Sequence, residues 1–177
     1  GTDTNRIKLY VNGVQNTEWD ETNYPNQNAD LGIGQSGVNH AIGATATGGN
    51  PFDGYMTHIN YVDGLQLAAS NFGEFNSDGV WIPKEPDVSD YGDNGFFLEA
   101  KQTGTNQNSS GMGADTSGKD NHMGVTNMGS NHSATDSPTN NFCTMNDAAK
   151  YSTGVTLKEG GLFVCGNASD AHIRGTF

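Results

Sequence analysis

The sequence predicts an all-β protein built from short antiparallel strands, and three observations support this class. Glycine is abundant, with 25 of 177 residues, whereas hydrophobic residues make up only 33% of the chain, below the roughly 45–50% of typical globular domains. Apolar and polar residues alternate in short runs, as they do in half-buried strands. Asp-Gly and Asn-Gly pairs end several of these runs, and such pairs are typical of tight turns because glycine tolerates a positive φ.

The first expected strand covers Arg6–Val11, with its three aliphatic residues directed inward. Asn12-Gly13 follows this strand and predicts a two-residue hairpin turn, with the return strand directly after it. Residues 30–34 and 40–47 are expected as two further short strands, separated by a turn that contains glycine and serine.

The rest of the chain is organised around the stretch Phe52–Pro83. Residues 55–62 alternate with period 2 between two Asp-Gly pairs, which predicts a strand. Residues 65–75 are too rich in apolar side chains for a solvated loop, so we expect a lid over one end of a sheet, with one helical turn at residues 68–72. Trp81 stands between two aliphatic residues and is expected in the core.

A proline-containing connector divides the chain into two blocks, residues 1–85 and residues 86–177. The second block is expected to be a loop-rich arm that carries a strand over residues 95–100 and a hairpin at about residues 154–166. Between these two elements, residues 102–135 hold few side chains that could build a core. We expect this segment to be either a long surface excursion or a region ordered by contacts with other chains.

Composition excludes several classes of function. The net charge of −12 repels nucleic-acid phosphates and anionic lipids, so no nucleic-acid partner is expected. The sequence contains no apolar run of about 18 residues, so no membrane insertion is expected. Cys143 and Cys165 are too few for a disulfide scaffold; two reduced thiols are expected, and a bridge between them stays open as an alternative.

Several motifs stand in an order that resembles the concanavalin A-like (laminin-G-like) jelly-roll domains of marine tailed-phage virion and tail-fibre proteins. They are YVNGVQ, FDGYMTHINYVDGLQL, FGEF, GVW, YGDNGFFL at residues 91–98, SGKDN at residues 117–121 and DSPTNNF at residues 136–142. The resemblance implies that residues 1–85 are the C-terminal part of an antiparallel β-sandwich. The chain is then a piece of a longer polypeptide, and the missing strands come from an upstream segment or another subunit.

Enzymatic activity is not expected. Some glycanases share the concanavalin A-like sandwich and use two carboxylates on one strand face, about 5 Å apart for retaining chemistry. The corresponding face here carries Thr57, Ile59 and Tyr61. The sequence has no Gly-x-Ser-x-Gly motif, and its five histidines are too dispersed to suggest a zinc site.

A short turn at residues 115–121 offers hard oxygen ligands of the kind that calcium prefers. The expected ligands are Asp115, Ser117, Asp120 and Asn121. The turn resembles the DSSGNGN turn of many laminin-G-like domains, from which Lys119 and the displaced Asp120 depart. Calcium is therefore the one cofactor that the sequence suggests, and the alternative is a turn closed by its own side-chain hydrogen bonds without a metal.

The polar loop at residues 16–29 carries a candidate carbohydrate site. Sugar rings stack on exposed aromatic side chains while amides bind the hydroxyl groups, and the candidate residues are Trp19, Asn23, Tyr24 and Asn26. The alternative is that Trp19 packs beneath its own loop.

Together these features favour a structural protein of a phage virion: a fibre, an appendage or a capsid decoration. The expected partners are other copies of the chain and other virion proteins, joined by strand addition and interlocking loops, together with host-surface glycans. The expected location is the virion. The alternative is an extracellular one, in which the chain is a secreted or cell-surface glycan-binding module or adhesin of lectin type.

Overall fold

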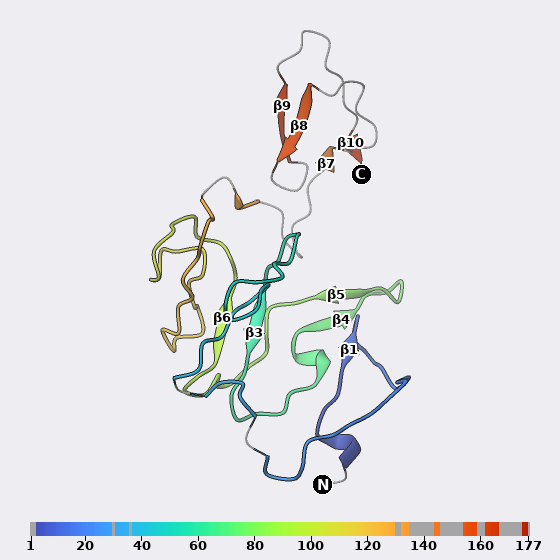
Figure 1. The fold of residues 1–177 in the computed structure, drawn as a ribbon. Coiled ribbons are helices and arrows are strands. Elements are labelled where there is room, and N and C mark those ends of the chain that lie inside the picture. The colour runs from blue at the N-terminus through green and yellow to red at the C-terminus, as the bar shows by residue number, and fades with distance from the viewer. Residues whose placement is uncertain are drawn as a thin grey trace. The chain divides into compact units, whose positions relative to one another are not determined.

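The computed structural model describes residues 3–29, 31–35, 37–129, 132–134, 144–145, 154–158, 162–166 and 175–176. Within these residues the elements are, in chain order, η1 (Asp3–Asn5), β1 (Tyr10–Val11), β2 (Val14–Gln15), β3 (Ile59–Tyr61), η2 (Ala69–Asn71), β4 (Gly73–Phe75), β5 (Trp81–Pro83), β6 (Phe96–Leu98), β7 (Thr144–Met145), β8 (Val155–Lys158), β9 (Phe163–Gly166) and β10 (Gly175–Thr176). The strands form antiparallel two-stranded sheets, and the described helices are single 3-10 turns (Figure 1). The all-β class is therefore confirmed.

The chain divides into two compact units. The first comprises Gly1–Asp53 and Gly64–Asp90, and the second comprises Gly54–Asp63 and Tyr91–Phe177. The change of unit after Asp90 lies close to the predicted connector. The sequence does not predict that residues 54–63 join the second unit, which they do because β3 pairs with β6.

The first hairpin forms at the predicted turn. Asn12 and Gly13 both have positive φ, 48° and 76°, as a type I′ turn requires. The turn pairs Val11 with Val14, and Tyr10 with Gln15. The ladder extends by one further bond, in which the N–H of Asn16 donates to the carbonyl oxygen of Leu9 at 2.9 Å.

The predicted inward direction of the first strand is wrong. Ile7, Leu9 and Val11 are all exposed. Tyr10 alternates with them along the chain, and it lines a cavity with Trp81. The hairpin therefore turns its tyrosine face toward the rest of the first unit and leaves its aliphatic face open.

The second hairpin, β4–β5, is closed by the side chain of Asn76. Its Oδ1 accepts the main-chain N–H groups of Asp78 at 3.0 Å and Val80 at 2.9 Å. Before it, the predicted helical turn is confirmed as η2. The predicted lid is wrong, because its last residues form strand β4, and Leu65 and Phe75 are exposed.

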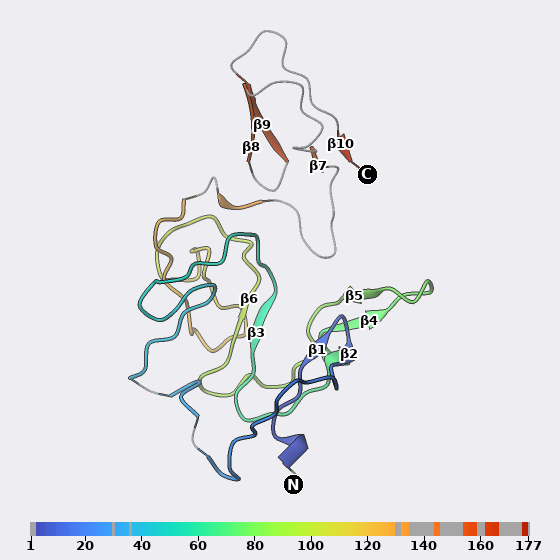
Figure 2. The same ribbon diagram turned by 45° about the vertical axis from the view of Figure 1, so that its right-hand side comes forward.

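Trp81 of β5 joins the two hairpins, which lie side by side in both ribbon views (Figures 1 and 2). Its indole ring lies against Gly13 of the first turn, where a Cβ atom would overlap the ring. The same ring lies against Gly73 of β4, where a Cβ atom would be 2.5 Å from Cζ2. Two glycines therefore make room for one large aromatic side chain.

In the second unit, β3 pairs with β6 in the register Ile59–Leu98, Asn60–Phe97 and Tyr61–Phe96. The strand predicted over residues 55–62 is shorter than expected because His58 has a left-handed backbone, with φ 51°. The strand predicted over residues 95–100 is confirmed as β6, which ends before Ala100, another residue with positive φ.

The core of the second unit gathers around β6. Phe97 and Leu98 are buried together with Tyr91, Met112 and Ala114. The rings of Tyr91 and Phe97 are stacked, with centroids 6.4 Å apart. The prediction that residues 102–135 contribute little to a core is wrong for residues 111–115, which are buried.

Two other predictions have different outcomes. The hairpin at about residues 154–166 is confirmed, because β8 and β9 pair over four positions. The strands predicted at residues 30–34 and 40–47 do not form in the described part of these segments, which contains bends and turns.

Cys165 is a half-buried free thiol, whereas Cys143 lies outside the described residues.

Candidate functional site

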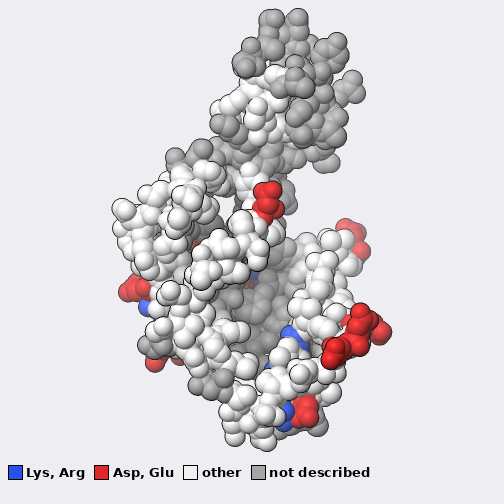
Figure 3. Space-filling view, viewed as in Figure 1, with Lys and Arg blue, Asp and Glu red and all other residues white. Residues whose placement is uncertain are grey.

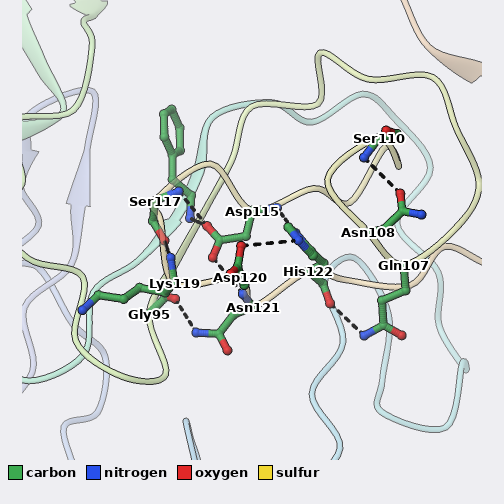
Figure 4. A network of polar contacts seen from close by, with 11 residues as sticks. Gly95, Gln107, Asn108, Ser110, Asp115, Ser117, Lys119, Asp120, Asn121 and His122 are labelled. Carbon is green, nitrogen blue, oxygen red and sulfur yellow. Dashed lines mark hydrogen bonds and ion pairs between the residues drawn. The ribbon is translucent and has the colours of Figure 1, made fainter.

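The turn predicted as a calcium site is centred on Asp115, whose residue is only 6% exposed. Its carboxylate accepts three main-chain N–H groups (Figure 4). Oδ1 accepts from Phe97 at 2.8 Å and from Ser117 at 2.9 Å, and Oδ2 accepts from Asn121 at 2.9 Å. Buried carboxylates need such donors, because an ion without partners is costly to remove from water.

Local sequence chemistry explains the shape of this turn. Gly118 and Asp120 both have positive φ, 85° and 60°, a conformation that glycine and aspartate adopt more readily than most residues. The hydroxyl of Ser117 accepts the N–H of Lys119 at 3.3 Å. The chain thereby reverses within a few residues and brings Asn121 back to Asp115.

Asn121 attaches the turn to the segment before β6. Its Nδ2 donates to the carbonyl oxygens of Asp93 at 2.9 Å and Gly95 at 2.8 Å. The adjacent residue, His122, accepts the N–H of Asp115 on Nδ1 at 3.0 Å. Because this ring nitrogen accepts a hydrogen bond, the neutral ring carries its proton on Nε2.

The electrostatics of the turn keep Asp115 ionised. Burial raises the pKa of its carboxyl group, but hydrogen bonds from the N–H groups of Phe97, Ser117 and Asn121 outweigh burial and hold the pKa below the ordinary value of 3.8. An ionised carboxylate that faces main-chain donors ties together segments that are distant in the sequence.

Three of the four predicted calcium ligands, Asp115, Ser117 and Asn121, are brought together by this turn. The fourth, Asp120, has a side chain that is 90% exposed, and its Oδ1 lies 3.8 Å from Nε2 of His122. Among the described residues, no group of three or more histidine, cysteine, aspartate or glutamate side chains could hold a metal ion. The geometry favours the self-bonded turn, and calcium binding stays a prediction.

The predicted carbohydrate loop is open to solvent. Trp19 is 46% exposed, so it does not pack beneath its own loop. Asn23 and Asn26 are exposed and Tyr24 is half-buried. Nη1 of Arg6 donates to the carbonyl oxygen of Pro25 at 2.7 Å and holds the loop near the start of the chain. Sugar binding here stays a prediction.

A second polar cluster surrounds Glu99, which the sequence did not single out. Burial raises the pKa of the Glu99 carboxyl group, but hydrogen bonds from Lys101 and Thr116, together with electrostatic interactions with Lys101 and His58, lower it overall. The ring of His58 meets Phe97 edge to face, with centroids 5.4 Å apart, and its buried Nδ1 has no hydrogen-bond partner.

An aromatic cavity lies beside Trp81, where the sequence predicts a core residue. Trp81 is instead half-buried and lines a cavity of about 410 Å³ with Tyr10 and Phe75. Sequence patterns miss this site because its residues come from two hairpins about 70 positions apart. Glycines on both hairpins were the available signal, since they permit a close approach of a bulky ring.

The chain matches no protein-family model, no curated protein and no solved structure. Within the part of the chain that the structure describes, no helix is long and apolar enough to span a membrane.

Proposed function

We propose that the chain is a structural component of a phage virion, part of a fibre, an appendage or a capsid decoration, that acts by assembly with copies of itself and other virion proteins. The order of the sequence motifs supports the virion context. In this proposal the first block belongs to a concanavalin A-like β-sandwich. The observation that carries the proposal is the open aliphatic face of the β1–β2 hairpin.

The open aliphatic face consists of Leu9, Val11 and Val14. Val11 and Val14 are directly paired across the turn, and they are 58% and 61% exposed. Leu9 lies two residues before Val11 and shares its face, because side chains alternate along a strand. Burying one such side chain fully stabilises an assembly by about 1.5–3 kcal/mol. A second subunit that covers this face thus stabilises the assembly by several kilocalories per mole.

Open strand edges give the same subunit a way to dock. Each described sheet has two strands, and an isolated two-stranded hairpin is marginally stable in water. Strand addition supplies partners for the main-chain groups at an open edge. On the face shown in Figure 3, the described charged side chains form small separate groups among described residues that are mostly uncharged.

A second candidate function is a secreted or cell-surface glycan-binding module of lectin type. The exposure of Trp19 beside Asn23 and Asn26 supports it. This candidate requires saturable glycan binding by the isolated monomer, whereas the virion component requires subunit assembly.

Sedimentation velocity of the wild-type chain and of the double variant Val11→Asp/Val14→Asp tests the proposal. We expect the wild type to sediment as a multimer and the double variant as a single chain, because two carboxylates cannot be buried without partners. Val80→Asp is the matched control, since Val80 is equally exposed, at 57%, in the loop of the other hairpin. A wild-type monomer at every concentration would contradict assembly, and equal dissociation of both variants would contradict the proposed face.

A further inference from the structure

The chain contains two Asn-Gly pairs, Asn12-Gly13 and Asn94-Gly95. In such a pair the main-chain nitrogen of glycine can attack the side-chain carbonyl carbon of asparagine, because glycine has no Cβ atom that would obstruct the approach. The attack requires a side-chain amide that is free to turn, an N–H group that makes no hydrogen bond, and room for the main chain to move. The structure gives the two pairs different surroundings in all three respects.

The first pair is open. Asn12 is exposed, and within the described residues neither its side-chain amide nor the N–H of Gly13 has a hydrogen-bond partner. A type I′ turn is closed by a hydrogen bond between its first and fourth residues, so the N–H of its third residue is not used. The pair lies at the tip of a two-stranded hairpin, an element that is marginally stable in isolation and opens locally.

The second pair is held in place. Nδ2 of Asn94 donates to Oδ2 of Asp63 at 2.9 Å. Gly95 is buried, and its carbonyl oxygen accepts Nδ2 of Asn121 at 2.8 Å. A Cβ atom on Gly95 would overlap the carbonyl oxygen of Tyr91. Neither the side-chain amide nor the main chain of this pair moves without breaking these contacts.

We propose that Asn12-Gly13 is a site of spontaneous deamidation, with water as the only co-reactant. The nitrogen of Gly13 forms a bond to Cγ of Asn12, and the side-chain nitrogen leaves as ammonia together with the proton of the Gly13 N–H, which closes a succinimide ring. Water then opens the ring at either carbonyl carbon. Attack at Cγ yields aspartate, and attack at the main-chain carbon yields an isoaspartyl linkage, in which the main chain is longer by one atom.

This modification acts on the contact between the two hairpins. Gly13 lies so close to the indole of Trp81 that a Cβ atom there would overlap the ring, so ring closure requires Gly13 to leave Trp81. An isoaspartyl linkage lengthens the turn between the paired residues Val11 and Val14, and Gly13 then no longer fits against the indole. The new carboxylate also adds a negative charge at the tip of the hairpin. The inference concerns the single chain and goes beyond the proposed assembly.

Trypsin separates the two pairs, which makes the test direct. The peptide Leu9–Lys84 contains the first pair, and the peptide Glu85–Lys101 contains the second. We would incubate the full chain in mildly alkaline buffer, digest samples over time, and locate each mass increase of about one dalton by fragmentation. We expect Asn12 to be converted at least tenfold faster than Asn94. Isoaspartyl methyltransferase should label part of the product.

Three variants connect the reaction to the structure. Asn12→Gly is the matched control, because glycine at both central positions still permits the type I′ turn but supplies no side-chain amide. Asp63→Ala removes the acceptor of the Asn94 amide and should raise the rate at Asn94 severalfold. Trp81→Leu removes the ring that lies against Gly13 and should raise the rate at Asn12 severalfold, with the rate at Asn94 unchanged.

The stability of the incubated chain gives a second readout. The urea midpoint of the first unit should fall as the isoaspartyl form accumulates, whereas Asn12→Gly treated in the same way should keep its midpoint. Equal rates at Asn12 and Asn94, or no conversion at Asn12, would overturn the inference. An unchanged rate at Asn94 in Asp63→Ala would also count against it, because protection would then not depend on the contact with Asp63. None of these results depends on the oligomeric state, which sedimentation measures separately.

Discussion

Trp81 and Gly13 are in direct contact, and this contact holds the two hairpins of the first unit together. The indole lies so close to the α-carbon of Gly13 that a Cβ atom there would overlap Cε3 of the ring. Gly13 also has φ 76°, so the type I′ turn and the packing of Trp81 impose glycine at one position for two independent reasons.

We expect Gly13→Ala to lower the free energy of unfolding by about 3 kcal/mol. A left-handed backbone costs a residue with a Cβ atom about 1–2 kcal/mol, and steric overlap in a packed site adds about 1–3 kcal/mol. Gly79→Ala is the matched control, because Gly79 has φ 75° but no atom within 4 Å of the added Cβ. It should lose only the backbone contribution. Urea denaturation of both variants measures the difference, and equal losses would refute the Trp81 contact.

Asp115→Ala should destabilise the second unit by about 3 kcal/mol or more, because three main-chain N–H groups lose their acceptor and each buried unsatisfied group costs about 1–3 kcal/mol. Asp120→Asn should change the free energy of unfolding by less than about 0.5 kcal/mol, since Asp120 is a surface residue. Thermal denaturation of the two variants distinguishes these effects. Comparable losses would show that Asp120 contributes to the turn as much as Asp115 does.

Millimolar calcium should leave the melting temperature of the wild type unchanged. Three main-chain N–H groups already occupy most of the acceptor sites of the Asp115 carboxylate, so little of it is left for a cation. The measurement is a melting curve with calcium and one with EDTA. A calcium-dependent increase in melting temperature that Asp120→Asn abolishes would instead establish the metal site predicted from the sequence.

Acid should destabilise the second unit through Asp115 and Glu99. Both carboxyl groups have a lowered pKa in the folded chain, below the ordinary values of 4.5 for Glu99 and 3.8 for Asp115. As the pH falls toward these values, the unfolded chain therefore binds more protons than the folded one. Their stabilising contribution is complete above about pH 5, and it is lost as the pH falls below these ordinary values and through the lower pKa values of the folded chain. Urea midpoints between pH 7 and pH 3 should therefore fall, and Asp115→Asn should reduce that fall. A midpoint that rises toward pH 3 would contradict this assignment.

Local chemistry predicted the elements whose determinants are adjacent in the sequence. The Asn12-Gly13 hairpin is one case, because two residues with positive φ define the turn. Strand β6 and the β8–β9 hairpin are others, since each has apolar residues bounded by turn residues. The all-β class follows from the same signals.

The predictions are wrong or incomplete where a residue distant in the sequence determines the local structure. The alternation of residue types over Arg6–Val11 shows that the two faces of the strand differ, but it does not show which face is covered by the rest of the protein. In the structure, the face that carries Tyr10 is the one directed toward Trp81. The residue types of the Asp115 turn are compatible both with calcium and with a self-bonded Asx turn. The N–H of Phe97, 18 positions away, favours the Asx turn, and no local pattern indicates that partner.

The molar mass of the purified chain in solution, measured by light scattering with and without excess EDTA, tests the central claim most directly. The proposed virion component should be a stable multimer with the same mass in both conditions, because open apolar faces and strand edges hold it together. A monomer in both conditions would contradict the proposal. A monomer that also loses thermal stability in EDTA would identify a calcium-dependent module and favour the lectin candidate.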